Sequence, residues 1–304
     1  MSWHATPDPE AGDLKACEAL EMAILAPSKD LGGFEVRRAL PTAKRRLVGP
    51  FIFLDQMGPS VLAPGTGVDV RPHPHIGLST LTYLFDGAMM HRDSLGIVQK
   101  IKPGEVNFMM AGRGIVHSER SPLEDRADGP RLYGLQAWVA SPSANEEDAP
   151  AFVHHGGDEQ PVVHDTGARV RVIAGTMLGA TAPLKTLSPT IFADVALAAG
   201  AAVPLDDTYE ERAAYVLKGE VAIAGQTFGP GQLLVFRPGD RISIRATEDT
   251  RLAILGGDAL DGKRYIWWNF VSSRQDRIEQ AKHEWATAKF DIVPGETEFI
   301  PLPA

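Results

Sequence analysis

Two short histidine motifs hold the residues of this chain whose types and spacing could do chemistry. His73 and His75 stand two residues apart in the stretch RPHPH, and His117 and Glu119 stand two apart in the stretch GRGIVHSE. Side chains alternate between faces along a β-strand, so the members of each pair point the same way. If the two strands approach inside one barrel, three imidazoles and one carboxylate converge on one point.

Such a donor set is typical of a site for a divalent transition metal. Neutral imidazole suits iron, nickel, copper or zinc, and a carboxylate shifts the preference toward redox-capable or harder ions. A single His-x-His pair in a β protein is more often a surface feature than a ligand set, and the second pair, His-x-Glu, is what favours the metal. Five other histidines are expected on the surface, in loops or at exposed positions: His4, His154, His155, His164 and His283.

The elements that must position these residues are short. The chain contains 30 Gly and 23 Pro, scattered at short intervals, which is typical of many strands joined by turns. A helix is expected from about Ser273 to Ala286, where apolar residues recur at helical spacing. The runs richest in β-branched, aromatic and other apolar residues predict strands at 51–54, 81–85, 135–139, 169–173, 213–217 and 233–236.

Two segments of the chain resemble each other. YLFDG at 83–87 is followed by PGEVNF at 103–108 and by Gly112, while YVLKG at 215–219 is followed by PGQLLV at 230–235 and by Gly239. This repetition predicts two copies of one small barrel. The boundary is expected in the loop-like stretch between about Ser141 and Thr166. The predicted units are an N-terminal extension (1–30), a metal-binding barrel (31–150), a linker (151–168), a second barrel (169–272) and a C-terminal helix with a tail (273–304).

The second copy lacks the ligand types. Counting back from Gly219, as His73 and His75 precede Gly87, leads to Leu205 and Asp207, and the counterpart of His117 is Ile244. We therefore expect the second barrel to be free of metal and to serve packing.

Composition narrows the function classes. The 304 residues carry a net charge of -9 and no basic cluster longer than Lys44-Arg45-Arg46, which argues against direct binding to nucleic acid. The single cysteine, Cys17, cannot form an internal disulfide, so a reducing compartment is expected. The sequence predicts neither a signal peptide nor a membrane span, and we expect a cytoplasmic protein that binds no membrane.

Several motifs together resemble the pirin family of the cupin superfamily: GPFIFLD (49–55), HPHIG (73–77), MHRDS (90–94), GRGIVHSE (112–119) and WNFVSS (268–273). The resemblance covers nearly the whole chain and implies an all-β fold of two tandem cupin barrels. It also implies that the first barrel holds one metal through His73, His75, His117 and Glu119. Fe(II) is the expected ion, with nickel, copper, manganese, cobalt or zinc as alternatives. The glutamate that many cupins place four residues after the second histidine is Ser79 here.

The resemblance also implies an activity, that of a quercetin 2,3-dioxygenase, which opens the ring of a flavonol with O2. Glu119 would act as ligand or as general base for the substrate hydroxyl. Apolar side chains would wall a dry pocket, with His91 and Arg92 at its mouth: Met89, Phe108, Met109 and Met110. At least half of the methionines are equally well explained as barrel core.

Two other functions stay open. Proteins that resemble pirin also act as metal- and redox-dependent partners of transcription factors or enzymes, and such a role would need an exposed charged patch, for which the stretch from Arg113 to Arg126 is the candidate. A metal-dependent enzyme acting on another small molecule is the third possibility. An enzyme is the first choice.

Overall fold

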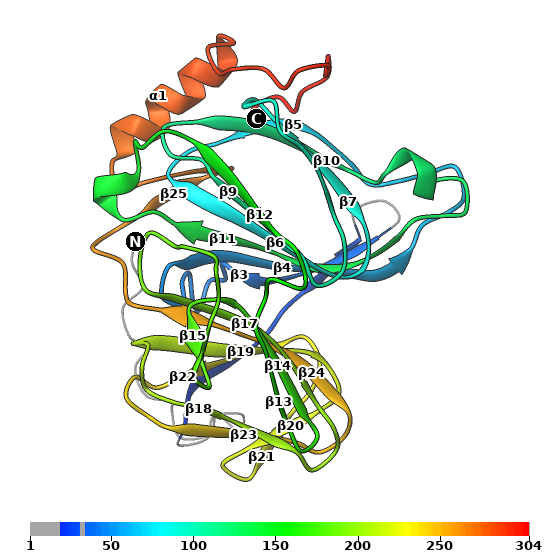
Figure 1. The fold of residues 1–304 in the computed structure, drawn as a ribbon. Coiled ribbons are helices and arrows are strands. Elements are labelled where there is room, and N and C mark those ends of the chain that lie inside the picture. Colours follow the sequence, from blue (N-terminus) through cyan, green and yellow to red (C-terminus); the bar gives the residue numbers. More distant parts are fainter. Residues whose placement is uncertain (1–18, 31–33, 304) are drawn as a thin grey trace.

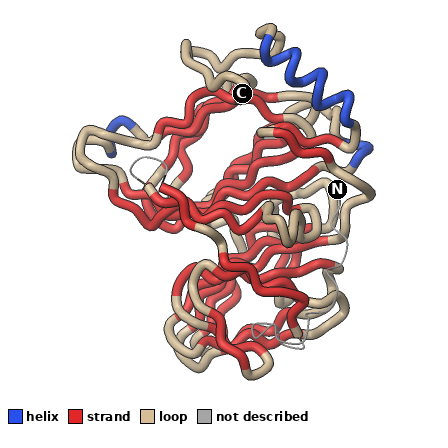
Figure 2. Tube along the Cα trace, turned by 180° about the vertical axis from the view of Figure 1, so that it is seen from behind, coloured by secondary structure: helices blue, strands red, loops and turns tan. Residues whose placement is uncertain are grey.

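Two β-barrels lie one above the other (Figure 1). The computed structural model describes residues 19–30 and 34–303, so Cys17 and His4 lie outside the described residues. Strands predominate in both barrels, and the long helix runs along the outer end of the first barrel (Figure 2). The prediction of an all-β fold with two tandem barrels and a short C-terminal helix is confirmed.

The first barrel is formed by two antiparallel sheets. Its seven-stranded sheet has the spatial order β12 (Ala151–His155), β9 (Val106–Met110), β6 (Leu78–Gly87), β11 (Arg131–Ala140), β4 (Phe51–Val61), β3 (Glu35–Leu40) and β2 (Ser28–Asp30). Its four-stranded sheet has the order β5 (Asp69–His75), β10 (Ile115–Arg120), β7 (Met89–Asp93) and β8 (Val98–Ile101).

The second barrel repeats this plan. Its seven-stranded sheet has the order β1 (Leu20–Leu25), β22 (Gln232–Phe236), β19 (Glu211–Lys218), β24 (Thr250–Gly257), β17 (Thr190–Leu197), β14 (Ala168–Ala174) and β13 (Val162–Asp165). Its four-stranded sheet has the order β18 (Ala202–Leu205), β23 (Ile242–Ala246), β20 (Val221–Ile223) and β21 (Gln226–Phe228). Strand for strand, the two large sheets correspond, which explains the repeated motifs.

The remaining elements are short or terminal: β15 (Thr176–Met177), β16 (Ala180–Thr181), β25 (Tyr265–Trp267), β26 (Phe270–Ser272), the 3-10 turns η1 (Leu123–Asp125) and η2 (Ser143–Asn145), and the helix α1 (Gln275–Ala286). The helix begins two residues after the predicted start. Its Ile278 and Ala281 pack against Ile76 and Phe270, which join the helix to the first barrel.

Two stretches differ from the predicted organisation. The strand β1, in the stretch expected to be an N-terminal extension, pairs with β22 and completes the second barrel's sheet. The stretch 151–168, expected to be a linker, contains β12, which pairs with β9, and β13, which pairs with β14. His154 and His155 are therefore half-buried strand residues, because β12 occupies in the first sheet the edge that β1 occupies in the second.

The glycines of the repeated motif are required by the turns that they form. Gly87 and Gly219 both have a left-handed backbone, with φ of +81° and +77°. A Cβ atom at Gly87 would lie 1.8 Å from the carbonyl oxygen of Arg131, and one at Gly219 would lie 2.6 Å from that of Asp249. Only glycine fits both the conformation and the space.

The largest core lies between the two seven-stranded sheets. Apolar side chains from both sheets, such as Leu81 and Tyr83 of the first and Tyr215 and Leu255 of the second, form one buried cluster. The interior of the second barrel holds a second, almost wholly apolar cluster. Since side chains alternate along each strand, the residues of the first large sheet that do not enter the core between the sheets face the interior of the first barrel.

Candidate metal centre

The strands β5 and β10 bring three histidines together inside the first barrel. In the antiparallel register His117 lies opposite His73, and Ile115 lies opposite His75. The intervening residues of β5 and β10, including Pro72 and Val116, point to the outer face. All three imidazoles are buried, and His75 and His117 are each 1% exposed.

The three side chains offer their ring nitrogens to one point. One ligand atom from each histidine lies within 4.8 Å of the other two. The Nε2 atoms of His75 and His117 are 3.1 Å apart. The Nδ1 of His73 lies 2.9 Å from the carbonyl oxygen of Arg71 and must donate to it, so its Nε2 carries the free lone pair. The geometry is that of a three-nitrogen ligand set.

Burial sets the charge state of these imidazoles. Desolvation lowers the pKa of His73 to about 4, and it holds the pKa values of His75 and His117 well below the ordinary range. The neighbouring histidines add to this lowering. At neutral pH all three rings are neutral, which is the form that binds a transition metal. The donor set therefore fits an ion such as iron, nickel, copper or zinc.

Glu119 lies beside this group rather than in it. It follows His117 on β10 across a shift in the register with β5, and it is buried. Its Oε1 accepts a hydrogen bond of 3.3 Å from the Thr82 hydroxyl, and burial raises the pKa of its carboxyl. Among the described residues, the atoms within 4.8 Å of one another come from the three histidines alone. That Glu119 is a fourth ligand stays a prediction.

His91 lies buried beside His117, at the side of the three-histidine group, and not at an exposed pocket mouth. Its ring is buried, its Nε2 lies 3.0 Å from Asp93 Oδ2, and its Nδ1 lies 3.4 Å from Nδ1 of His117. Phe152 stacks on the ring at a centroid distance of 4.6 Å. Arg92, the next residue on β7, is half-buried and alternates to the other face. The His91-x-Asp93 spacing, the same as that of His73 and His75, could have indicated this inward pair.

The predicted pocket wall is partly wrong. Phe108 and Met110 belong to the core between the two large sheets, because they alternate with residues that face the barrel interior. Met109 has the opposite orientation and packs with Phe152, while Met89 lies in a separate cluster. The aromatic neighbours of the histidines are instead Trp138, 5.2 Å from the His75 ring, and Phe53, stacked on Trp138 at 4.2 Å.

The second barrel has apolar residues at the corresponding positions. In the pairing of β18 with β23, Val203 lies opposite Ile244 and Leu205 lies opposite Ile242. Val203 and Leu205 therefore correspond to His73 and His75, and the count back from Gly219, which leads to Leu205 and Asp207, stops two residues short of them. The loop between β18 and β19 is longer than the one between β5 and β6, so the same count back from the turn glycine falls short. Ile244 is the counterpart of His117, as predicted.

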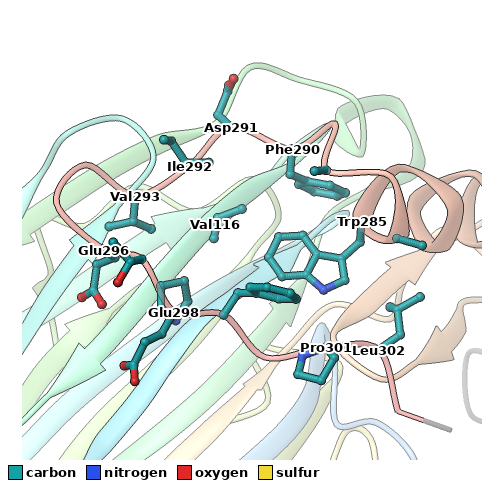
Figure 3. Close-up of a pocket in the computed structure, with 15 residues that line it drawn as sticks. Val116, Trp285, Phe290, Asp291, Ile292, Val293, Glu296, Glu298, Pro301 and Leu302 are labelled. Carbon is teal, nitrogen blue, oxygen red and sulfur yellow. The ribbon is translucent and has the colours of Figure 1, made fainter.

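A cleft of about 500 Å³ lies on the outer face of β5 and β10 (Figure 3). Pro72 and Val116 form its floor, and Trp285, Phe290 and Phe299 of the C-terminal region form much of its wall. Since Pro72 and Val116 alternate with the histidines along β5 and β10, the cleft lies on the side of these strands away from the three histidines. The cleft forms where residues 285–302 pack on the outer face of β5 and β10, and it is separate from the group of histidines.

The charged stretch that could have marked a regulatory patch is largely paired internally. Arg126 bonds to Asp69, and Arg120 bonds to Asp69 and to Glu296 of the tail. Glu124 pairs with Lys100. These contacts hold loops together and leave few of the charges uncompensated.

Comparison with known families assigns the fold. A family model described as Pirin matches residues 33–139, and one described as Pirin C-terminal cupin domain matches residues 192–291. A Pirin-like protein of Caulobacter vibrioides is 47% identical over 93% of this chain and 99% of its own length. The chain belongs to the pirin family. The two matched regions fall in the first and second barrels, so this pirin-family chain is a bicupin.

Other relatives carry an enzyme name. A Pseudomonas aeruginosa protein named "Putative quercetin 2,3-dioxygenase" is 36% identical over 84% of this chain and 79% of its own length. A crystal structure of quercetin 2,3-dioxygenase from Acinetobacter baumannii has a TM-score of 0.86 and 31% identity, covering 93% of this chain and 95% of that one. None of the helices in the described part of this chain has the length and apolarity that a membrane crossing requires.

Proposed function

We propose that this pirin-family protein is a metal-dependent dioxygenase that opens the ring of a flavonol such as quercetin, or of a related small molecule, with O2. The observation that carries the proposal is the set of three buried, neutral histidines inside the first barrel. One divalent transition metal would be held by His73, His75 and His117, with Glu119 as fourth ligand. Fe(II) is the first choice, and nickel, copper, manganese, cobalt and zinc are alternatives.

Two further observations support an enzyme over a packing domain. The interior of the first barrel has polar side chains, such as Asn107 and Gln136, where the second barrel has apolar ones, although burying a polar group costs stability unless it is hydrogen-bonded. The likeness to a solved quercetin 2,3-dioxygenase covers both barrels. Both are compatible with an O2-dependent reaction on a small molecule.

The chain's own residues have definable tasks. A bound metal supplies Lewis-acid attraction for the substrate oxygen and redox chemistry with O2. Glu119 accepts the proton of the flavonol 3-hydroxyl, and burial raises the pKa of its carboxyl toward the range in which a general base works well. Thr82 holds the carboxylate through its hydroxyl. Trp138 and Phe53 keep water from the ring of the substrate.

The overall reaction is balanced without a further reductant. Two carbon–carbon bonds of the central flavonol ring break, both atoms of O2 enter the ester product, and the carbon between the broken bonds leaves as carbon monoxide. Substrate and O2 are therefore the only reactants required.

Replacing His75 by the residue of the second barrel tests the proposal. Metal-loaded wild type should consume quercetin and O2 together, whereas His75→Leu should lose at least about a hundredfold in turnover, the order expected when a catalytic group is removed. His283→Ala, on the outer helix, is the matched control and should keep full turnover. If His75→Leu keeps the turnover of wild type, the proposal is refuted. It is also refuted if metal-loaded wild type consumes neither quercetin nor O2, and that result would favour a metal-dependent binding role.

A further inference from the structure

A row of polar side chains crosses the interior face of the first large sheet. Consecutive cross-strand partners in the register carry the row from β12 to β3: His154, Asn107, Thr82, Gln136, Asp55 and Arg38. Thr82 contacts Glu119 on the opposite sheet, which shows that the row faces the metal centre. The row ends at the barrel's edge, where half of the Arg38 side chain is exposed.

The second barrel shows what the fold itself requires at these positions. Tyr83 and Tyr215 occupy equivalent places in the repeat, so the residues that precede them, Thr82 and Ala214, correspond. The register of the second sheet then gives the equivalent row: Ala23, Leu234, Ala214, Ile254, Ala193 and Val172. Every member is apolar. The barrel therefore forms without a polar row.

The polar side chains are only partly satisfied by one another. His154 Nδ1 bonds to Asn107 Oδ1 at 2.8 Å, and Arg38 makes two bonds to Asp55. The Thr82 hydroxyl shares its single proton between Gln136 Oε1 at 2.8 Å and Glu119 Oε1 at 3.3 Å. The hydrogen bonds of the Asn107 and Gln136 side chains are made by their amide oxygens, so within residues 19–30 and 34–303 their NH2 groups donate to no protein acceptor. Two donors that flank Thr82 are thus available to an acceptor that enters the barrel.

An aromatic row lies next to the polar one. Trp138 lies two residues after Gln136 on β11, and Phe53 lies two residues before Asp55 on β4. The two rings stack on each other, and the Arg38 guanidinium lies 4.5 Å above the Phe53 ring. A planar ring system could lie against this aromatic surface while its oxygen atoms meet the amide donors.

We propose that the polar row determines substrate specificity: Asn107 and Gln136 bind the oxygen substituents of a planar polyphenol at a distance from the atoms held by the metal. The inference rests on the proposed function and adds the residues that select among flavonols. A flavonol with hydroxyl groups on its outer rings should be preferred to one without them.

Exchange of the two amides for their counterparts in the second barrel tests this role. The probes are quercetin and 3-hydroxyflavone, which share the 3-hydroxyl and 4-carbonyl groups but differ in the outer hydroxyls. Dissociation constants are measured without O2 on metal-loaded protein, from the flavonol absorbance. Wild type should prefer quercetin by roughly tenfold or more, and Asn107→Leu with Gln136→Ile should abolish that preference while binding 3-hydroxyflavone within about threefold of wild type.

A matched control lies on the opposite face of the same sheet. Gln56→Ile replaces a buried glutamine that faces the second barrel, where its Oε1 accepts from Tyr215, so it should lower stability and keep the preference. An unchanged preference in the double variant, with quercetin turned over by wild type, would overturn the specificity proposal alone. If wild type prefers quercetin to 3-hydroxyflavone, the double variant loses this preference, and wild type does not turn quercetin over, the proposed function alone would be overturned. Absence of quercetin binding to wild type would overturn both.

Discussion

At the scale of single residues, the site depends on imidazoles that are neutral because they are buried. His117 on β10 faces His75 on β5, and their Nε2 atoms are 3.1 Å apart. His117→Ala should lose stoichiometric metal while the fold persists, because the second barrel and the core between the sheets do not involve this side chain. Metal content by atomic absorption, with circular dichroism as a check of folding, measures this.

The matched control for that experiment is His164→Ala, which removes an exposed histidine of β13. It should keep the metal content of wild type. Equal metal content in His117→Ala and wild type would show that the ligand assignment is wrong.

The proposed role of Glu119 as general base can be tested separately from metal binding. Glu119→Gln keeps the size and the hydrogen bond from Thr82 but cannot accept a proton, so metal should be partly retained while turnover falls by roughly a hundredfold to ten-thousandfold. Single-turnover measurement of quercetin loss on metal-loaded protein gives the rate. Turnover equal to that of wild type would remove Glu119 from the role of base.

Among the elements, the C-terminal tail packs on the outer face of β5 and β10 and is hydrogen-bonded to both strands. Ile300 donates its N–H to the Pro72 carbonyl at 2.8 Å, Trp285 donates its indole N–H to the Ile300 carbonyl at 3.0 Å, and Glu296 accepts from Ser118. The pKa of Glu296 is lowered, mainly by its hydrogen bond from Arg120. The tail is thus fixed to β10 by a contact that requires an ionised carboxylate.

This contact should release in acid. Because the pKa of Glu296 is lower in the docked state, its contribution to docking is complete above the ordinary glutamate range and is lost as the pH falls through the lowered value. The indole resonance of Trp285 in NMR spectra, assigned through Trp285→Phe, should shift in that range in wild type and lose the step in Glu296→Gln. A resonance that is constant until global unfolding would contradict this docking contact.

Strand identity could be predicted from local composition, whereas strand partnership could not. The six predicted runs all lie in strands, because β-branched and aromatic residues mark a buried pleated surface. Local composition does not predict the edge strands β1 and β12, since each is short and acquires its role only from a partner elsewhere in the chain.

The same limit explains the site. The candidate ligands can be predicted because each pair, His73 with His75 and His117 with Glu119, lies within one strand. The buried position of His91, the face on which Phe108 lies and the polar row cannot be predicted in this way, because each depends on the register between strands that are distant in the sequence.

At the scale of the whole molecule, two tyrosines join the barrels reciprocally. Tyr83 donates to Asp194 of the second barrel, and Tyr215, its counterpart, donates to Gln56 of the first, each at 2.9 Å. Tyr83→Phe and Tyr215→Phe should each lower the free energy of unfolding by about 1–3 kcal/mol, because a buried acceptor loses its donor. Urea unfolding measures the change, and metal content should stay constant.

Tyr265→Phe serves as control, since this half-buried ring lies against Lys263. It should change the free energy of unfolding by no more than about 0.5 kcal/mol. If the two interface variants are as neutral as this one, the reciprocal bonds do not hold the barrels together.

The most direct test of a metal-dependent dioxygenase in the first barrel combines two measurements on one sample. The protein is reconstituted with Fe(II) without O2, its metal content is determined, and quercetin and O2 are then added while carbon monoxide is collected. We predict one metal per chain and carbon monoxide in proportion to the quercetin consumed. A fully loaded protein that releases no carbon monoxide, or a protein that binds no metal, would contradict this account.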